Sequence, residues 1–219
     1  MTAPPIDLLA DYPEAQLDPH WIEDNKRAAE KSLARVPVRY STATVTTSEV
    51  AAWVRTLVSA AVRDARAFNP KVQRGPSLLL LGPVGTGKTH QVYGAIREIV
   101  HTGVSCSWLV TTAADLYADL RPNQNRNDQV FDRFANVPLL VLDDLGAHKG
   151  TEWTAEQTFR LINHRYENEL ATVVTSNLTA PQLRDRVGDR ITSRLVEMCR
   201  HVALKGSDRR RQQTELPIS

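Results

Sequence analysis

The chain has 219 residues, of which 42% are hydrophobic and 24% charged, and a formal net charge of +2. This composition is typical of a soluble globular protein with one substantial core. The sequence has no run of eighteen apolar residues and no basic, apolar leader, so we expect no membrane span, no signal peptide and a cytoplasmic location. Cys106 and Cys199 stand alone, without a CxxC pair or a Cys/His cluster, so the sequence supports neither a zinc module nor a disulfide framework.

Charge is distributed unevenly along the chain. The first thirty residues hold seven acidic and two basic side chains, whereas residues 184–211 hold nine basic and four acidic ones. This asymmetry predicts an acidic docking segment at one end and an anion-facing surface at the other. The alternative is two solvated faces of opposite sign.

The predicted elements begin with a polar helix over residues 19–34, capped by Asp18 and opened by Pro19. A second helix starts near Ser48, and its apolar residues recur at helical spacing, so it should pack on a core. Short apolar strands follow at 77–81, 104–110, 138–142, 171–176 and 201–205. Helices separate them, including two near 112–120 and 128–136. This alternation is typical of an α/β fold, here a five-stranded parallel sheet with helices on both faces.

The stretch "GPVGTGKT", residues 82–89, matches G-x-x-x-x-G-K-[ST] between the first predicted strand and a helix. Its glycines let backbone N–H groups turn inward to cradle phosphates, and the following helix directs its N-terminus at the same anion. Lys88 should reach the β- and γ-phosphates, and the Thr89 hydroxyl should bind Mg²⁺. The predicted nucleotide contacts are Gly82, Pro83, Val84, Gly85, Thr86, Gly87, Lys88, Thr89 and His90.

Two further motifs end predicted strands at the edge where parallel sheets bind ligands. In "LVLDDLG", Asp143 is expected to hold Mg²⁺ through water and Asp144 to polarise an attacking water, unless the pair is a mere strand exit. In "TVVTSN", Asn177 could orient that water or contact the γ-phosphate. It could equally cap the next helix, for which Thr179 is another start signal.

The stretch "GDRITSRL", residues 188–195, predicts a helix that Asp189 caps after Gly188 has ended the previous one. A buried stripe on this helix is formed by Ile191, Leu195 and Met198. Arg190 and Arg194 share a neighbouring face. Glu197 lies three residues after Arg194, so spacing alone also allows an ordinary exposed ion pair.

Taken in order, "GPVGTGKTH", "LLVLDDLG", "TVVTSNLT" and "GDRITSRL" resemble the AAA+ P-loop ATPases of the DnaC/IstB-like family, the helicase loaders of bacteria and phages. The resemblance covers about residues 36–211. It implies the strand order 5-1-4-3-2, with two helices between the second and third strands as in the initiator and loader branch. The domains expected are a helical extension at 1–46, the ATPase at 47–211 and a tail at 212–219 that is too short for a lid domain.

The resemblance also implies a site shared between subunits of a homo-oligomer. Arg194 resembles the arginine finger that completes the neighbouring active site, and Arg190 an auxiliary basic residue. Arg210 matches the sensor II position, with Arg209 and Arg211 as rivals. The reaction implied is hydrolysis of ATP with Mg²⁺, slow because Asp144 stands where most of these ATPases have glutamate.

The partners implied are a hexameric replicative helicase and single-stranded DNA. The short N-terminal region lacks the zinc ligands of some relatives, so helicase docking is assigned to the helix 19–34 of the acidic N-terminal region. Basic grooves with aromatic side chains suit single strands, and Tyr117 or Phe131 could provide a stacking surface. The basic candidates for DNA contact are Lys149, Arg121, Arg126 and Arg133, which could instead solvate a loop.

Other functions remain to be distinguished. A transposition helper ATPase would share this fold but act on double-stranded DNA and recruit a transposase. An adapter with little turnover would fit the shorter Asp144. A small-molecule kinase is disfavoured because no arginine-rich lid insertion is evident, and a GTPase because no NKxD motif occurs.

Overall fold

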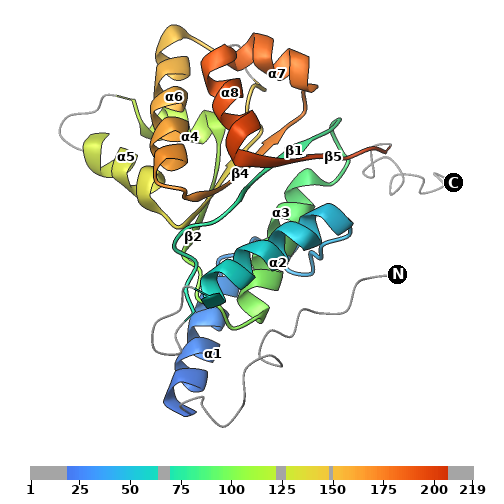
Figure 1. Cartoon of the computed structure of the whole chain (residues 1–219), viewed down its shortest axis with the longest axis vertical. Helices are drawn as coiled ribbons and strands as arrows, with labels where there is room; N and C mark the ends of the chain where they lie inside the picture. Colours follow the sequence, from blue (N-terminus) through green and yellow to red (C-terminus); the bar gives the residue numbers. More distant parts are fainter. Residues whose placement is uncertain (1–18, 64–69, 122–126, 148–149, 207–219) are drawn as a thin grey trace, which may run out of the picture.

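The structure is a computed structural model that describes residues 19–63, 70–121, 127–147 and 150–206 (Figure 1). Its centre is a five-stranded parallel sheet with the order β2-β3-β4-β1-β5, which confirms the order predicted from the sequence. The strands are β1 (Ser77–Leu81), β2 (Trp108–Thr112), β3 (Leu139–Asp143), β4 (Ala171–Ser176) and β5 (Cys199–Ala203). The three central strands are mainly apolar because helices cover both faces of the sheet.

Helices form a layer on each face of this sheet (Figure 1). One layer contains α1 (Pro19–Leu33), α2 (Ser48–Arg63) and α3 (Lys88–His101). The other contains α4 (Ala113–Asp119), α5 (Asn127–Asn136), α6 (Glu152–Glu167), α7 (Ala180–Val187) and α8 (Asp189–Met198). Side chains of β1 alternate between the two cores: Leu78 and Leu80 pack under α2 and α3, and Leu79 under the opposite layer.

Strand β3 is shifted by one residue from the predicted 138–142, and β5 by two residues from the predicted 201–205. Two further differences from the prediction have local physical reasons. Strand β2 begins at Trp108 rather than at 104, because Ser105 bridges to Lys71 and the chain joins β3 only from Trp108 onward. The N-cap of α8 is Gly188, not Asp189. Gly188 has φ 90° and ψ 161°, a conformation that favours glycine, and Asp189 instead pairs with Arg184 as the first residue of the helix.

The last turn of α1 and the residues after it are attached to the start of β2. The indole of Trp108 donates a hydrogen bond to the Ser32 hydroxyl (2.8 Å), and the Arg35 guanidinium donates to the Trp108 carbonyl (2.7 Å). Arg35 also lies over the Trp108 ring, 4.3 Å from its centroid. The expected cap Asp18 lies outside the described residues, and the domain division at residue 46 stays a prediction.

A fully buried arginine, Arg165 at the end of α6, connects α6 to α5, to the approach to β3 and to β4. It has no carboxylate partner among the described residues, and burial lowers its pKa to about 9. Its guanidinium donates to five oxygens: the carbonyls of Phe134, Ala135, Val137 and Ala171, and the Thr172 hydroxyl. The end of α5, the approach to β3 and the start of β4 are thereby held together.

Candidate nucleotide site

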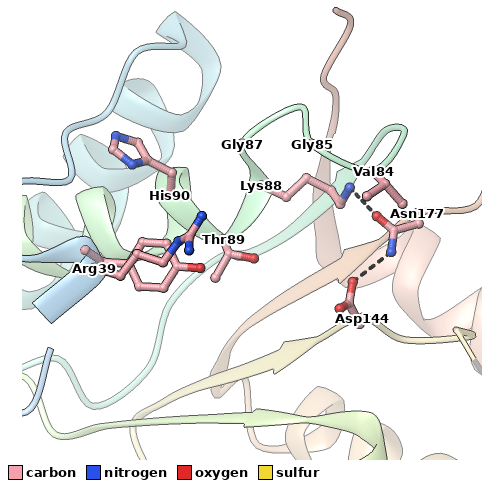
Figure 2. Close-up of a pocket in the computed structure, with 10 residues that line it drawn as sticks. Arg39, Val84, Gly85, Gly87, Lys88, Thr89, His90, Asp144 and Asn177 are labelled. Carbon is pink, nitrogen blue, oxygen red and sulfur yellow. Dashed lines mark hydrogen bonds between the residues drawn. The ribbon is translucent and has the colours of Figure 1, made fainter. Parts of the chain in front are cut away.

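A pocket of about 580 Å³ opens at the carboxyl ends of β1, β3 and β4 (Figure 2). Its lining comes from the loop after β1, the first turn of α3, the ends of β3 and β4, and the 3₁₀ turn η3 (Val38–Tyr40). The lining residues are Arg39, Tyr40, Val84, Gly85, Gly87, Lys88, Thr89, His90, Asp144 and Asn177. The polar ends of strands that are far apart in sequence therefore meet in one cavity.

Backbone conformation shapes the loop between β1 and α3 into a cradle. Gly85 and Gly87 have φ of 81° and 93°, in the left-handed region that side chains with a Cβ rarely adopt. Gly87 is also the N-cap of α3, so the unpaired N–H groups of that helix start beside the pocket. The loop is therefore built to bind an anion such as a phosphate.

Lys88 is nearly buried and its ammonium group is held by three oxygens. It donates to the carbonyls of Gly82 (2.6 Å) and Pro83 (2.9 Å) and to Oδ1 of Asn177 (2.5 Å). The amide nitrogen of Asn177 in turn donates to the Asp144 carboxylate (2.9 Å), as Figure 2 shows. Asn177 thus connects the lysine of the phosphate cradle to the acid at the end of β3.

The capping alternative for Asn177 is wrong. The N-cap of α7 is Thr179, whose hydroxyl accepts the backbone N–H of Gln182, with Pro181 just inside the helix. The Asn177 side chain is therefore not needed for the helix, and both ends of its amide face the pocket.

The two acids at the end of β3 are oriented by one hydroxyl, that of Thr175. Thr175 donates to Oδ1 of Asp143 (2.5 Å) and accepts the backbone N–H of Asp144 (3.0 Å). Asp144 has φ 57°, a left-handed conformation that costs a non-glycine residue on the order of 1 kcal/mol. That backbone turn separates the acids, so that Asp144 lines the pocket while Asp143 remains buried.

Asp143 and Thr89 form the part of the site that suits a divalent cation. The Thr89 hydroxyl donates to Oδ2 of Asp143 (3.1 Å), and burial is the largest cause of the raised pKa of Asp143. A buried carboxylate beside a hydroxyl offers the oxygen ligands that Mg²⁺ prefers. No group of three or more acidic, His or Cys side chains within the described residues could hold a metal ion alone. Asp143 and Thr89 therefore fit a Mg²⁺ that nucleotide phosphates also hold.

Arg39 and Tyr40 are pocket residues that the sequence did not reveal, because "VPVRYSTATVTT" has the pattern of a linker. The Tyr40 ring stacks on Tyr93 of α3 with centroids 4.7 Å apart. Nearby, the Thr44 backbone N–H donates to Nε2 of His90 (3.4 Å). A Cβ at Gly94 would lie 2.5 Å from the Thr44 carbonyl carbon, so only glycine permits this close packing. The linker thus forms one wall of the pocket.

Arg194 does not line this pocket. It lies on α8, where Nη1 is 3.6 Å from Oε2 of Glu197, so the ion pair allowed by spacing is present. Its Nε also donates to Oδ1 of Asn163 on α6 (3.2 Å). Arg190 lies one turn earlier, 4.0 Å from the centroid of Phe159. The arginine-finger role of Arg194 stays a prediction.

The remaining basic candidates are only partly described. Arg121 and Arg133 are exposed, whereas Arg126, Lys149, Arg209, Arg210 and Arg211 lie outside the described residues. The two proposed stacking rings are half-buried against the second core. The Tyr117 hydroxyl is bonded to that of Thr158 (2.7 Å), and Arg160 covers Phe131, 4.7 Å from its centroid. DNA contact by these residues stays a prediction.

We expect Asn177→Ala to slow ATP hydrolysis by roughly 10²-fold, the cost of losing one positioned polar group in an active site. The Lys88 contacts to Gly82 and Pro83 remain in this variant, so the ATP dissociation constant should change far less. Single-turnover hydrolysis and equilibrium ATP binding measure the two effects. The control is Asn136→Ala, which removes an exposed amide from α5. Equal losses of binding and turnover would contradict a role in the chemical step.

The fold and the pocket together define a P-loop nucleotide-binding protein. The family model described as "IstB-like ATP binding protein" matches residues 41–216, and the chain belongs to that family. Membership of an ATP-binding family agrees with the phosphate cradle that the sequence predicted and that the structure shows. No helix within the described ranges is long and apolar enough to cross a membrane.

Similarity to individual proteins is more limited. The phage-like element PBSX protein XkdC of Bacillus subtilis is 30% identical over 141 residues, which are 61% of this chain and 52% of that protein. This chain spans about half the length of the curated relatives it matches. The crystal structure of the DnaC helicase loader has a TM-score of 0.62 at 23% identity, covering 77% of this chain and all of that one. The replication initiator DnaA bound to AMPPCP and single-stranded DNA has a TM-score of 0.57 at 24% identity, covering 73% of this chain and 45% of that one.

Proposed function

We propose that this protein is a DnaC-like ATPase that places a hexameric replicative helicase on single-stranded DNA. Its active form is a homo-oligomer in which Arg194 of one subunit completes the ATP site of the next. The proposal of a homo-oligomer rests on the position of Arg194. This residue lies outside the pocket of its own chain, on a partly exposed face of α8. Similarity in fold to the DnaC helicase loader, over the whole of that chain, supports the loading role.

In this proposal each pocket residue has one task. The loop at 82–87 and Lys88 hold the phosphates, which replace Asn177 as the partner of the ammonium group. Thr89 and Asp143 would hold Mg²⁺, which when bound would neutralise charge on the phosphates. Asp144 polarises the attacking water, and Asn177, released from Lys88, orients it. The side chain of Asp144 is one methylene shorter than glutamate, so we expect slow turnover without assembly or DNA.

An IstB-like transposition helper is the second candidate, favoured by the family to which the chain belongs. It would use the same pocket and the same arginine. The two candidates differ in their partner, helicase or transposase, and in their preference for single- or double-stranded DNA. An adapter with little turnover would bind ATP without the acceleration by assembly and DNA that a loader requires.

The test is capture of the replicative helicase encoded by the same genome, with ATP, with a non-hydrolysable analogue and without nucleotide. We expect helicase recovery to depend on nucleotide, and single-stranded DNA to stimulate ATP hydrolysis. Lys88→Ala should reduce hydrolysis to background and abolish the nucleotide dependence, because it removes the ammonium group that reaches the phosphates. Absence of helicase together with capture of a transposase would establish the second candidate.

The same assay tests α1, which lies in the acidic N-terminal region, as the docking segment. Asp24 and Glu30 are exposed on α1. We expect Asp24→Lys combined with Glu30→Lys to reduce helicase capture without changing ATP hydrolysis by the free protein. Glu156→Lys, an exposed reversal on α6, is the matched control. Equal capture by both proteins would exclude these side chains of α1 as docking contacts.

A further inference from the structure

Each arginine on the exposed side of α8 lies over an aromatic ring of α6. Arg190 lies over Phe159, and Arg194 lies 4.4 Å from the centroid of Tyr166. Phe159 and Tyr166 are seven residues apart, or two helical turns, so both rings occupy the same side of α6. Such cation–π contacts restrict the positions that a guanidinium can adopt.

Polar contacts also fix the edge of the Arg194 guanidinium. Its Nε donates to Oδ1 of Asn163 (3.2 Å), and the amide nitrogen of Asn163 donates to Oε1 of Glu167 (2.8 Å). The second bond orients the Asn163 amide with its oxygen towards the arginine. The Nε edge of Arg194 is therefore attached to α6, whereas its Nη1 lies 3.6 Å from Oε2 of the exposed Glu197.

Glu197 has a second and shorter contact. The Tyr166 hydroxyl donates a hydrogen bond to Oε1 of Glu197, while Nη1 of Arg194 approaches Oε2. One tyrosine thus contacts both members of the ion pair, with its ring under the arginine and its hydroxyl on the carboxylate. If Arg194 turned to another anion, Glu197 would keep this partner.

We propose that Tyr166 and Asn163 are positioning residues for Arg194, and that the Tyr166 hydroxyl retains Glu197 while Arg194 exchanges it for a phosphate of the ATP bound by a neighbouring copy. This proposal rests on the proposed function, in which Arg194 acts in trans. Only the Nη groups need to change partner, because a phosphate accepts hydrogen bonds from those donors while Nε and the ring contact remain in place. Glu197 then competes with phosphate for Arg194 within the assembly, and this competition slows hydrolysis there.

The test compares turnover at saturating ATP, at protein concentrations where the rate per subunit no longer rises. Tyr166→Phe keeps the ring and removes the hydroxyl, so Glu197 is free to pair fully with Arg194. We expect kcat to fall by about three- to tenfold. Glu197→Gln should raise kcat by about two- to fivefold, the factor to which an exposed ion pair corresponds. KM for ATP should not change, because neither residue lines the pocket.

The double variant Tyr166→Phe with Glu197→Gln separates positioning from a merely structural role. We expect it to recover the turnover of Glu197→Gln, since the competitor is then absent. The control is Glu156→Gln, which removes an exposed charge from α6, the helix that carries Tyr166. It should leave turnover unchanged. Wild-type turnover in Tyr166→Phe would overturn the proposal, and so would a double variant as slow as Tyr166→Phe alone.

Arg194→Ala, measured in parallel, distinguishes the two levels of the argument. Unchanged turnover in Arg194→Ala would refute the function proposed for this arginine. Loss of turnover in Arg194→Ala, combined with no effect of Tyr166→Phe or Glu197→Gln, would refute only the positioning by Tyr166.

Discussion

Replacing Arg194 with alanine is expected to reduce ATP turnover by roughly 10³-fold, the lower end of the effect of arginine fingers. ATP binding should persist, because the phosphate cradle, Lys88 and the Asp143–Thr89 pair lie on other elements of the same chain. Steady-state hydrolysis and equilibrium nucleotide binding measure the two properties. A matching loss of ATP affinity would indicate that Arg194 supports the fold or the pocket rather than the chemical step.

Mixing two inactive proteins tests whether Arg194 acts in the neighbouring site. An Arg194→Ala subunit keeps its pocket, and an Asp144→Ala subunit keeps its arginine. In a head-to-tail assembly of an equal mixture, about a quarter of the contacts join an intact pocket to an intact arginine. We therefore expect partial recovery that is greatest near equal amounts. No recovery at any ratio would contradict action in trans.

The second large effect is expected for Arg165→Met, which should lower the free energy of unfolding by about 3–5 kcal/mol. Methionine fills part of the space but donates no hydrogen bond. It would leave the buried carbonyl oxygens at the end of α5 and the start of β4 without their donor. Each buried acceptor left unpaired costs roughly 1–3 kcal/mol, and partial relaxation reduces the sum.

Urea-induced unfolding followed by circular dichroism measures this loss. The control is Arg160→Met on the same helix, whose guanidinium is near the surface over Phe131 and should cost less than about 1 kcal/mol. Arg165→Lys should lie closer to Arg165→Met than to wild type, since one ammonium group cannot reach five separated acceptors. Similar stabilities for Arg160→Met and Arg165→Met would show that the buried hydrogen bonds contribute little.

Local signals in the sequence were strong enough to predict the sheet and the ends of its strands. The apolar runs at 77–81 and 171–176 form strands with those bounds, because apolar side chains flanked by polar residues leave little choice of register. The predicted start of β2 at residue 104 is wrong. Val104 and Cys106 are apolar because they pack against the first core, although they precede the paired strand. A hydrophobic pattern predicts which residues are buried, but it does not predict where the hydrogen-bonded pairing of β2 with β3 begins.

The residues missed in the candidate site are those whose role depends on tertiary contacts. Arginine and tyrosine in a linker carry no periodic signal, so Arg39 and Tyr40 could not be assigned to the pocket. Asn163 and Tyr166 precede Arg194 by about thirty residues, and only the packing of α6 on α8 brings them together. The sequence did identify Lys88 and Asn177, and the structure adds that the Lys88 ammonium group donates a hydrogen bond to the Asn177 side chain.

The attachment of α1 at Trp108 places α1 beside the C-terminal end of α3. The N-terminal end of α3 borders the phosphate cradle, and residues after its C-terminal end form a groove with the last turns of α1. A helix of 14 residues is about 21 Å long and resists bending over that distance. The groove beside α1 and the loop that binds phosphate therefore lie at opposite ends of one continuous helix.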